Sequence, residues 1–438
     1  MTESKFPKPD WQAIRSIKLD LNLKNLYDRL FLILFVVDIA LRMVWLNQPS
    51  GSLIFDEWYY VNVARVILGL PQSVGSNGQP PYANPILGID PNREHPPLAK
   101  LLIAFSMYIL GDNGYGMRIP SVIFGSLGVL VFYLLMKKTS KFVQAPIIAT
   151  FLFSFDTLTF VLGRIAILDI FALTFMLLGV YWYFTGHPYF SALGMALASL
   201  TKITGVAGFG VIVVVQALRC IKNRGKAGTW DAFFKWFEKY LITFAASFLL
   251  LLTLLDNITR LLWVGPPYSN PFEHIQYILT YSTALVSSCP NGIISCPWQW
   301  LANQIQIPYL VVNVQVSSGT AVNKYDSIAF LGMMNPTILY LTIPAMLYLS
   351  YTYFNAKDDF SLFNLVWFAS TYLPYLPAVI FGNRVTYLFY FLPAMPAICA
   401  AVAYMIADQN PPKLVVLFYL GVVIAWFFWM FPFKIIPT

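Results

Sequence analysis

The stretch GYGMRIPSVIFGSLGVLVFYLLMKK, residues 114–138, decides the fold class of this protein. Residues 118–136 are almost wholly apolar, and the run is long enough to cross the roughly 30 Å hydrocarbon core of a membrane as a helix. Lipid cannot satisfy free backbone N–H and C=O groups, so a lipid-exposed spanning segment of this kind has to be helical. The stretch therefore predicts a transmembrane helix that ends at two lysines.

The rest of the chain has the same character. Of its 438 residues, 58% are hydrophobic and 11% are charged, and the mean hydropathy of +0.64 is far above that of soluble domains. We expect an all-α polytopic membrane protein, with a cytoplasmic N-terminal segment over residues 1–29 and a transmembrane domain over residues 30–438. About eleven spans are predicted, at residues 30–47, 118–136, 143–161, 166–185, 188–201, 203–218, 240–262, 334–354, 362–381, 385–407 and 414–432. The shorter apolar run at 98–111 predicts a helix at the membrane interface.

Lysine and arginine residues set the predicted orientation, because they stay on the cytoplasmic side of short loops. With a cytoplasmic N-terminus, most of the 28 Lys and Arg residues fall on the inner side, in clusters such as KKTSK at 137–141. These clusters account for the net charge of +8, so no nucleic acid partner is expected. Two long segments, residues 48–117 and 263–333, then face outward, and function is expected there.

The cysteines and the N-terminus agree with this topology. Cys289 and Cys296 lie close together in SCPNGIISCPW, in the second outer segment. An oxidising exterior favours a disulfide between them, whereas a metal pair has no nearby histidine. The polar first 29 residues do not look like a cleavable signal, so the first span is expected to direct insertion.

Two adjacent acids, Asp56 and Glu57, begin the segment FDEWYYVNVARVILGL, whose apolar spacing suits a short helix along the membrane surface. Acids at a helix start often serve only as caps or dipole partners, contributing about 0.5–2 kcal/mol. For this pair taken alone, that structural interpretation stays open.

Further ionisable residues are predicted at or near the outer ends of helices: Glu94, His95, Arg118, Arg164, Asp169, Lys202 and Arg384. Each could be a snorkelling side chain or part of a structural ion pair. Acids and bases converging from five or six helix ends instead predict a polar site at the outer membrane surface.

The chemistry of such a site is limited by what can reach it. The chain has neither a Walker A loop nor a G-x-G-x-x-G motif between strand and helix. An outward-facing site also lacks a supply of membrane-impermeant nucleotide donors, so an activated group has to arrive attached to a lipid. Arg and Lys would bind the lipid phosphate, and Asp or Glu would act as general base on an incoming hydroxyl.

Several motifs occur in an order that is typical of one family: FDEWYY, EHPPLAK, the 114–138 stretch, GRIAILD, LTKITG, CPWQW and RVTYLFYFLPA. In these motifs the chain resembles the protein O-mannosyltransferases, the dolichyl-phosphate-mannose–protein mannosyltransferases of the GT-C superfamily, over nearly the whole membrane region. HPPL with its preceding glutamate favours this family over the related aminoarabinose transferases, where a lysine commonly takes the histidine position. The resemblance implies a GT-C fold of about eleven helices, N-in and C-out, with interfacial helices in the first outer loop. The second outer segment is too short for the MIR domain of the eukaryotic enzymes, so we expect a prokaryotic plasma membrane.

The resemblance also implies a reaction, the inverting transfer of mannose from a polyprenyl (dolichyl) phosphate to Ser or Thr hydroxyls of proteins on the extracytoplasmic face. Its partners would be this donor, a protein or lipid-linked acceptor, and membrane lipids. Asp56 would be the general base, and Glu57 would hold the acceptor or orient that base. The groups expected to bind the leaving phosphate are Arg118, Arg164 and Arg384, with Lys202 behind them. Those expected at the acceptor or cavity are Glu94, His95 and Asp169.

No cofactor is predicted as a firm requirement for this chemistry. A divalent metal is a weaker alternative, because Glu94, His95, Glu273 and His274 could supply two Glu-His pairs, although no ligand spacing compels it.

Other functions remain open at this point. The nearest is another GT-C transferase that uses a polyprenyl-phosphate sugar donor with a lipid or glycan acceptor. A transporter would carry its charges near the membrane midplane on broken spans, whereas here they cluster at one surface. The adjacent Asp56 and Glu57 argue against a lipid-binding scaffold.

Overall fold

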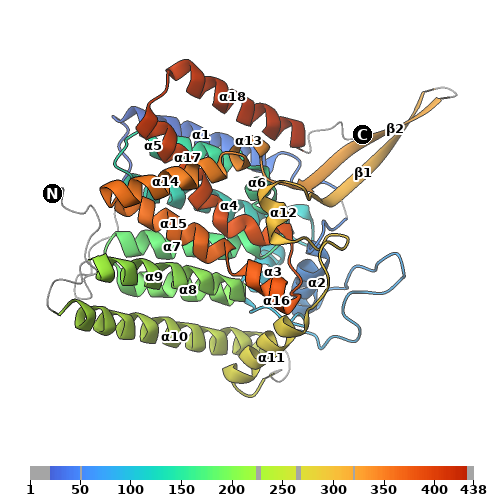
Figure 1. Ribbon diagram of the computed structural model, residues 1–438. Helices are drawn as coiled ribbons and strands as arrows, with labels where there is room; N and C mark the ends of the chain where they lie inside the picture. Colours follow the sequence, from blue (N-terminus) through green and yellow to red (C-terminus); the bar gives the residue numbers. More distant parts are fainter. Residues whose placement is uncertain (1–19, 50–51, 223–227, 263–267, 319–320, 432–438) are drawn as a thin grey trace.

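The computed structural model describes residues 20–49, 52–222, 228–262, 268–318 and 321–431, and it is mostly helical (Figure 1). Its α-helices are α1 (Leu26–Met43), α2 (Glu57–Leu68), α3 (Leu98–Leu110), α4 (Gly114–Thr139), α5 (Ala145–Ser154), α6 (Thr157–Leu162), α7 (Asp169–Phe184), α8 (Pro188–Thr201), α9 (Val206–Lys222), α10 (Thr229–Leu262), α11 (Pro271–Ala284), α12 (Pro297–Leu301), α13 (Pro336–Leu339), α14 (Thr342–Ala356), α15 (Asp359–Tyr372), α16 (Tyr375–Gly382), α17 (Met395–Gln409) and α18 (Lys413–Met430). Two 3₁₀ helices, η1 (Ile203–Gly205) and η2 (Leu388–Ala394), and two strands, β1 (Ile307–Ser318) and β2 (Ala321–Gly332), complete the described elements.

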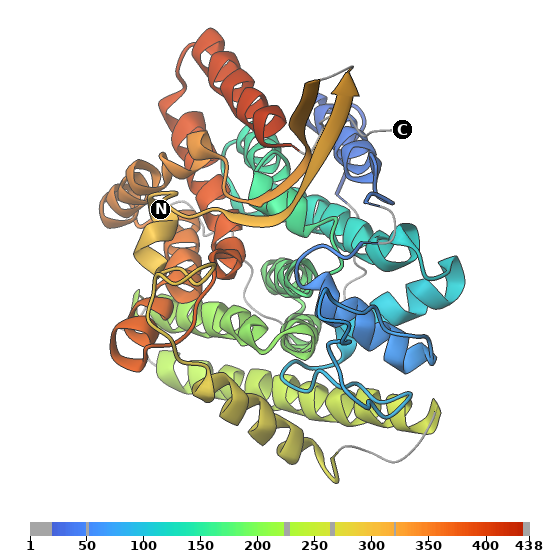
Figure 2. The same ribbon diagram turned by 90° about the vertical axis from the view of Figure 1, so that its right-hand side faces the viewer.

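The long helices lie side by side, with α18 at one edge of the molecule and α10 at the opposite edge (Figure 1). The short helices α2, α11, α12 and α16 gather at one end of this bundle, together with β1 and β2. Figure 2 looks onto that end. Segments from both predicted outer loops therefore meet at one end of the bundle.

The predicted spans fall largely on helices, but fewer of these are long enough to cross a membrane alone. Within the described part of the chain, six helical stretches are long and apolar enough to do so: Gly114–Thr139, Ile203–Lys222, Thr229–Ile258, Asp359–Gly382, Leu388–Gln409 and Lys413–Met430. The predicted span at 143–161 is divided into α5 and α6, because the Asp156 side chain caps α6 by accepting the Thr159 N–H at 2.9 Å. The first helix begins at Leu26, slightly before the predicted residue 30.

The expectation of an all-α protein is wrong in one place. Strands β1 and β2 form an antiparallel hairpin in the second predicted outer segment, with Ile307 opposite Gly332 and Ser318 opposite Ala321. The β1 sequence IPYLVVNVQVSS is rich in β-branched residues, which favour extended backbone and disfavour a helix. This composition was the available signal, and hydropathy alone does not register it.

Close packing of α7 on α8 brings two chain segments of the predicted site together. A Cβ added to Gly194 of α8 would lie 2.8 Å from the Cα of Gly179 in α7, so the two backbones touch at these glycines. Helix α7 starts at Asp169, and α8 ends at Thr201 with Lys202 as its C-cap. The two helices are consecutive and antiparallel, so Asp169 and Lys202 meet at the same end of the bundle.

Candidate active site

The first acid of the FDEWYY segment, Asp56, stands at the start of α2 but does not cap it. Its side chain makes no capping hydrogen bond to that helix, so the interpretation of this acid as a helix cap is not supported. The side chain is half-buried. Burial raises the pKa of Asp56 to about 7, the nearby Asp169 adds to the effect, and Lys202 opposes it. A carboxylate with this pKa is suited to take up a proton near neutral pH.

The residue before Asp56 has an unusual backbone. Phe55 has a φ of +52°, in the left-handed region that bulky residues rarely occupy. Its ring packs on Tyr309 of β1, with centroids 4.6 Å apart, and on Phe389 of η2, 5.8 Å away. These contacts fix the turn that presents Asp56.

The second acid, Glu57, is engaged in a buried ion pair. Its carboxylate accepts two hydrogen bonds from the Arg118 guanidinium, both of 2.8 Å, and it also accepts the backbone N–H groups of Ile54 and Ala166. Both side chains of the pair are almost completely buried. The arginine also donates to the backbone carbonyls of Leu46, Gln48 and Ser52.

This geometry bears on the roles predicted for Glu57 and Arg118. The oxygens of Glu57 are turned to Arg118 and to two backbone amides, which suits the predicted alternative of orienting the base at Asp56. Arg118 is not placed to bind a donor phosphate, because its guanidinium is buried and its donors are directed at Glu57 and three carbonyls. The pair instead joins α2, α4, the segment after α1 and the turn before α7, and so holds the start of α2 in place.

Arg164, another predicted phosphate ligand, is turned toward the end of α1. It is buried in the turn between α6 and α7 and donates a 2.6 Å hydrogen bond to the Val44 carbonyl. Its guanidinium lies 5.9 Å from the Phe160 ring centroid and 5.6 Å from that of Phe431. These contacts direct the side chain toward the end of α1, and the residue does not line the cavity described below.

Lys202 and Asp169 form an ion pair, because the packing of α7 on α8 brings them together. Lys202 Nζ lies 2.8 Å from Asp169 Oδ1, and it also lies about 5 Å from the ring centroids of Phe389 and Tyr390. Burial opposes the charge of Lys202, but Asp169 and Tyr390 together hold the pKa of Lys202 above its usual value. The ammonium therefore stays charged beside Asp56.

The EHPPLAK motif forms a loop that is organised by its lysine. Lys100, in the first turn of α3, is fully buried and makes an ion pair with Asp90. Its ammonium also donates to the backbone carbonyls of Asn92 and His95. No role is predicted for Lys100 from the sequence, although its position inside the EHPPLAK motif is an available signal.

The same loop places His95 and Glu94. The His95 ring lies 6.1 Å from that of Tyr60 in α2, and its Nδ1 is buried with no hydrogen-bond partner among the described residues. Burial, with Lys202, Lys100 and Arg384 nearby, holds the pKa of His95 well below its usual value, so the imidazole is neutral. Glu94 accepts a 2.5 Å hydrogen bond from the Asn92 amide, and burial raises the pKa of Glu94.

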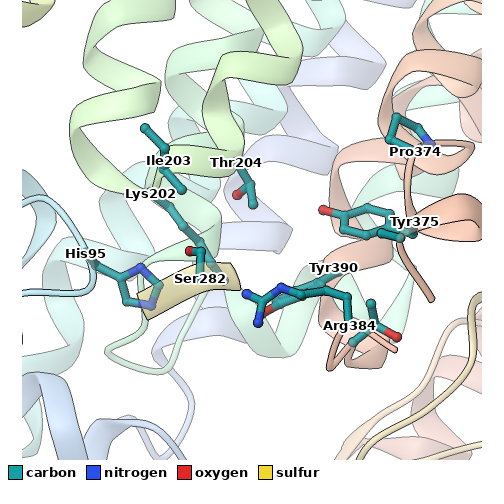
Figure 3. A pocket seen from close by; sticks show the side chains of 11 residues that line it. His95, Lys202, Ile203, Thr204, Ser282, Pro374, Tyr375, Arg384 and Tyr390 are labelled. Atoms are coloured by element: carbon teal, nitrogen blue, oxygen red, sulfur yellow. The ribbon is translucent and has the colours of Figure 1, made fainter. Parts of the chain in front are cut away.

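Three of the predicted residues share a cavity of about 250 Å³ (Figure 3). Its lining consists of His95, Lys202, Ile203, Thr204, Ser282, Pro374, Tyr375, Ala378, Arg384, Thr386 and Tyr390. In the close-up, His95 and Lys202 lie on one side, Arg384 and Tyr390 lie on the other, and Ser282 of α11 lies between them. Two cations, a neutral imidazole and several hydroxyls suit an anionic, hydroxyl-rich headgroup.

The segment carrying Arg384 is held by the predicted cysteine pair. The structure contains a disulfide between Cys289 and Cys296. The adjacent Ser295 exchanges hydrogen bonds with Thr386, through its N–H to the Thr386 carbonyl and through its carbonyl from the Thr386 hydroxyl. Arg384 itself donates to the Leu285 carbonyl at 3.0 Å. The disulfide loop therefore braces one wall of the cavity.

The residues considered for a metal do not form a ligand set in the described ranges, where no group of three or more His, Cys, Asp or Glu side chains is placed to hold an ion. Glu273 is exposed and accepts hydrogen bonds from Ser269 beside the start of α11. Both ring nitrogens of His274 are engaged, with the Asp256 carboxylate and the Arg93 carbonyl. These contacts do not fit the expected Glu-His pairs.

Comparison with known proteins agrees with the resemblance found in the motifs. The family model for dolichyl-phosphate-mannose-protein mannosyltransferase matches residues 94–206. The polyprenol-phosphate-mannose–protein mannosyltransferase of Mycolicibacterium smegmatis is 23% identical over 464 residues, which cover 89% of this chain and 86% of that protein.

Two solved structures show the same fold. The Saccharomyces cerevisiae protein O-mannosyltransferase Pmt1-Pmt2 complex, bound to the sugar donor, matches with a TM-score of 0.68 at 11% identity, covering 95% of this chain and 91% of the matched chain. ArnT from Cupriavidus metallidurans matches with a TM-score of 0.53 at 16% identity, covering 85% of this chain and 59% of that one. The chain is therefore similar in sequence to dolichyl-phosphate-mannose–protein mannosyltransferases, and it shares the helical fold of these solved structures.

Proposed function

We propose that this integral membrane protein transfers mannose from a polyprenyl phosphate to Ser or Thr hydroxyls of proteins. The observation that carries the proposal is the position of Asp56, whose pKa is raised to about 7, beside a cavity that presents Lys202, Arg384 and His95. A base and an anion-binding wall are the two components that this transfer needs. The donor class and the acceptor class follow the M. smegmatis relative, which is named for both.

In the proposed step, the acceptor oxygen attacks the anomeric carbon from the face opposite the phosphate. The bond from that carbon to the phosphate oxygen breaks, its electron pair stays on the phosphate, and Asp56 takes the hydroxyl proton. The leaving phosphate needs no proton, so a second catalytic acid is unnecessary, and the sugar configuration inverts. Lys202 and Arg384 stabilise the charge that develops on the phosphate.

His95, Asp169 and Glu94 support this step in different ways. Neutral His95 lines the cavity and is suited to hydrogen-bond a sugar or acceptor hydroxyl. Asp169 orients the Lys202 ammonium through their 2.8 Å contact. Glu94 is hydrogen-bonded to Asn92 beside His95, and we assign it to the acceptor side of the loop.

The experiment is a transfer assay with purified protein, a polyprenyl-phosphate mannose donor and a Ser/Thr-containing peptide. Mannosylated peptide with the anomeric configuration opposite to that of the donor is expected, and the Asp56→Asn variant should form little product. Transfer to a lipid or glycan acceptor, with none to peptide, would favour the other GT-C activity instead. Assays after chelation, with and without added Mg²⁺ or Mn²⁺, test the prediction that no cofactor is required against the alternative of a divalent metal.

The membrane arrangement is part of the same proposal. We assign about eleven crossings, a cytoplasmic N-terminus and an extracytoplasmic active site in a prokaryotic plasma membrane, supported by the distribution of Lys and Arg. A cysteine introduced into KKTSK at 137–141 should react with an impermeant thiol reagent only after the membrane is broken. One introduced at Asn323 should react in intact cells, and the reverse pattern would overturn the orientation.

A further inference from the structure

His274 joins three segments that are distant in the sequence. It lies in the first turns of α11, and only 3% of its surface is exposed. Its Nδ1 is 3.0 Å from the Asp256 carboxylate at the end of α10, and its Nε2 is 3.1 Å from the Arg93 carbonyl. The ring also stacks on Tyr268, with centroids 4.1 Å apart and planes 12° apart.

Both ends of this linkage reach the cavity. The Arg93 carbonyl belongs to the loop that continues directly into Glu94 and His95, and His95 lines the cavity. Helix α11 carries Ser282, which lines the same cavity about two turns after His274. The imidazole therefore links the cavity wall that carries His95 to the wall that carries Ser282, although His274 does not itself line the cavity.

The two partners determine the protonation state of the ring. A carbonyl oxygen only accepts hydrogen bonds, and so does an ionised carboxylate. Holding both contacts at once therefore requires an N–H on each nitrogen, which is the imidazolium form. A neutral ring has one N–H and can keep only one of the two bonds.

The charged and titratable groups around the ring are consistent with a cation there. Asp256 faces it from α10, and Asp90, which is paired with Lys100, contributes from the loop. Arg93 is turned to the ring of Tyr268, 5.8 Å from its centroid. Burial raises the pKa of Tyr268, so its hydroxyl is neutral and adds no charge.

We propose that His274 and Asp256 are positioning residues for donor binding, in which the imidazolium of His274 clamps α11 to the loop of His95. The inference rests on the proposed function, because it assigns donor binding to the cavity. Loss of the His274 contacts separates the two walls of the cavity and weakens binding of the lipid-linked sugar. Asp56 and its role as base are not changed. The KM for donor should therefore rise more than kcat falls.

The first test uses His274→Phe, which keeps the stack on Tyr268 but removes both hydrogen bonds, and His274→Gln, which keeps one. We expect about a tenfold rise in donor KM for the first variant and a smaller rise for the second. His187→Phe is the matched control, since His187 is also buried and stands just before α8, at the end of that helix remote from Lys202. A donor KM at the wild-type value in both His274 variants would refute the positioning role.

The second test uses Asp256→Asn, because an amide at this position can donate to Nδ1. A neutral ring then keeps both contacts, with its Nε2–H on the Arg93 carbonyl. The donor KM should therefore rise less in Asp256→Asn than in Asp256→Ala, which leaves Nδ1 of His274 without this partner. Equal rises in the two variants would refute a role for the contact between Asp256 and His274 in the clamp.

Hydrogen exchange separates a failure of this inference from a failure of the proposed function, because it needs no activity. Amides of residues 90–95 should lose protection in His274→Phe but not in His187→Phe, after correction for intrinsic exchange rates. Unchanged protection would refute the clamp even if the enzyme transfers mannose. Reduced protection in a protein that transfers no mannose would support the clamp and reject the function.

Discussion

Replacing Asp56 with asparagine should lower activity and raise stability at the same time. In the folded protein, burial lifts the pKa of this carboxyl from 3.8 to about 7. A difference of about 3 pKa units corresponds to about 4 kcal/mol, which is the most that holding the charged carboxylate in this site can cost. The asparagine variant avoids that cost but has no base.

The pH dependence gives the sign of the effect. The folded pKa is the higher one, so between about pH 4 and 7 the folded protein binds more protons at Asp56 than the unfolded chain does. The contribution of this group to stability therefore falls as the pH rises through that window, and it is constant above it. The stability gap between Asp56→Asn and the wild type should widen by about 2 kcal/mol between pH 5 and 7.

The measurements are apparent melting temperature in detergent and turnover with the mannose donor. Turnover of the variant should fall about 10²–10⁴-fold, and turnover of the wild type should rise about tenfold from pH 6 to pH 8 as Asp56 loses its proton. Asp231→Asn, at an exposed position in the first turn of α10, is the control and should change neither quantity. Near-normal turnover by a folded Asp56→Asn protein would remove Asp56 from the mechanism, and parallel melting profiles would refute its raised pKa.

Three further outcomes follow from the site. Glu57→Gln leaves the buried Arg118 without its carboxylate, so it should destabilise the protein by about 3–5 kcal/mol and reduce the monodisperse yield in size-exclusion chromatography. The control is Asp112→Asn in the more exposed Arg65–Asp112 pair, which should lower the free energy of unfolding far less. Arg384→Gln should raise the donor KM and lower kcat, because it removes a cation from the cavity wall, and steady-state kinetics that match the wild type would exclude it from phosphate binding. Lys100→Met should free the loop that the lysine holds, so faster hydrogen exchange over residues 90–95 is expected, and unchanged exchange would contradict this role.

Features carried by local sequence could be predicted, and features that depend on distant contacts could not. The helices follow from apolar runs, so α4 falls on the predicted span 118–136, and η2 together with α17 falls on the predicted span 385–407. The division of α5 from α6 depends on one capping aspartate, Asp156, inside an apolar run, and hydropathy averages over it.

The site shows the same division. Asp56, Lys202 and Arg384 could be selected because ionisable residues are rare in an apolar chain and stand at helix ends. The role of Arg118 could not be predicted, because its partner Glu57 lies 61 residues away and no local pattern distinguishes a phosphate-binding arginine from one in a buried pair. The clamp at His274 likewise joins residues that are 181 positions apart.

The backbone of Phe55 has a consequence for engineering of this protein. A bulky residue with a φ of +52° costs roughly 1–3 kcal/mol, and glycine would adopt the same conformation with little cost. A library of variants screened only for thermostability will therefore include small residues at position 55. There, relief of the backbone strain stabilises the protein, and loss of the ring contacts to Tyr309 and Phe389 destabilises it. A screen for transfer should select against the same substitutions, because those contacts hold Asp56 in place. Stabilised variants of this enzyme are thus best sought with position 55 held fixed.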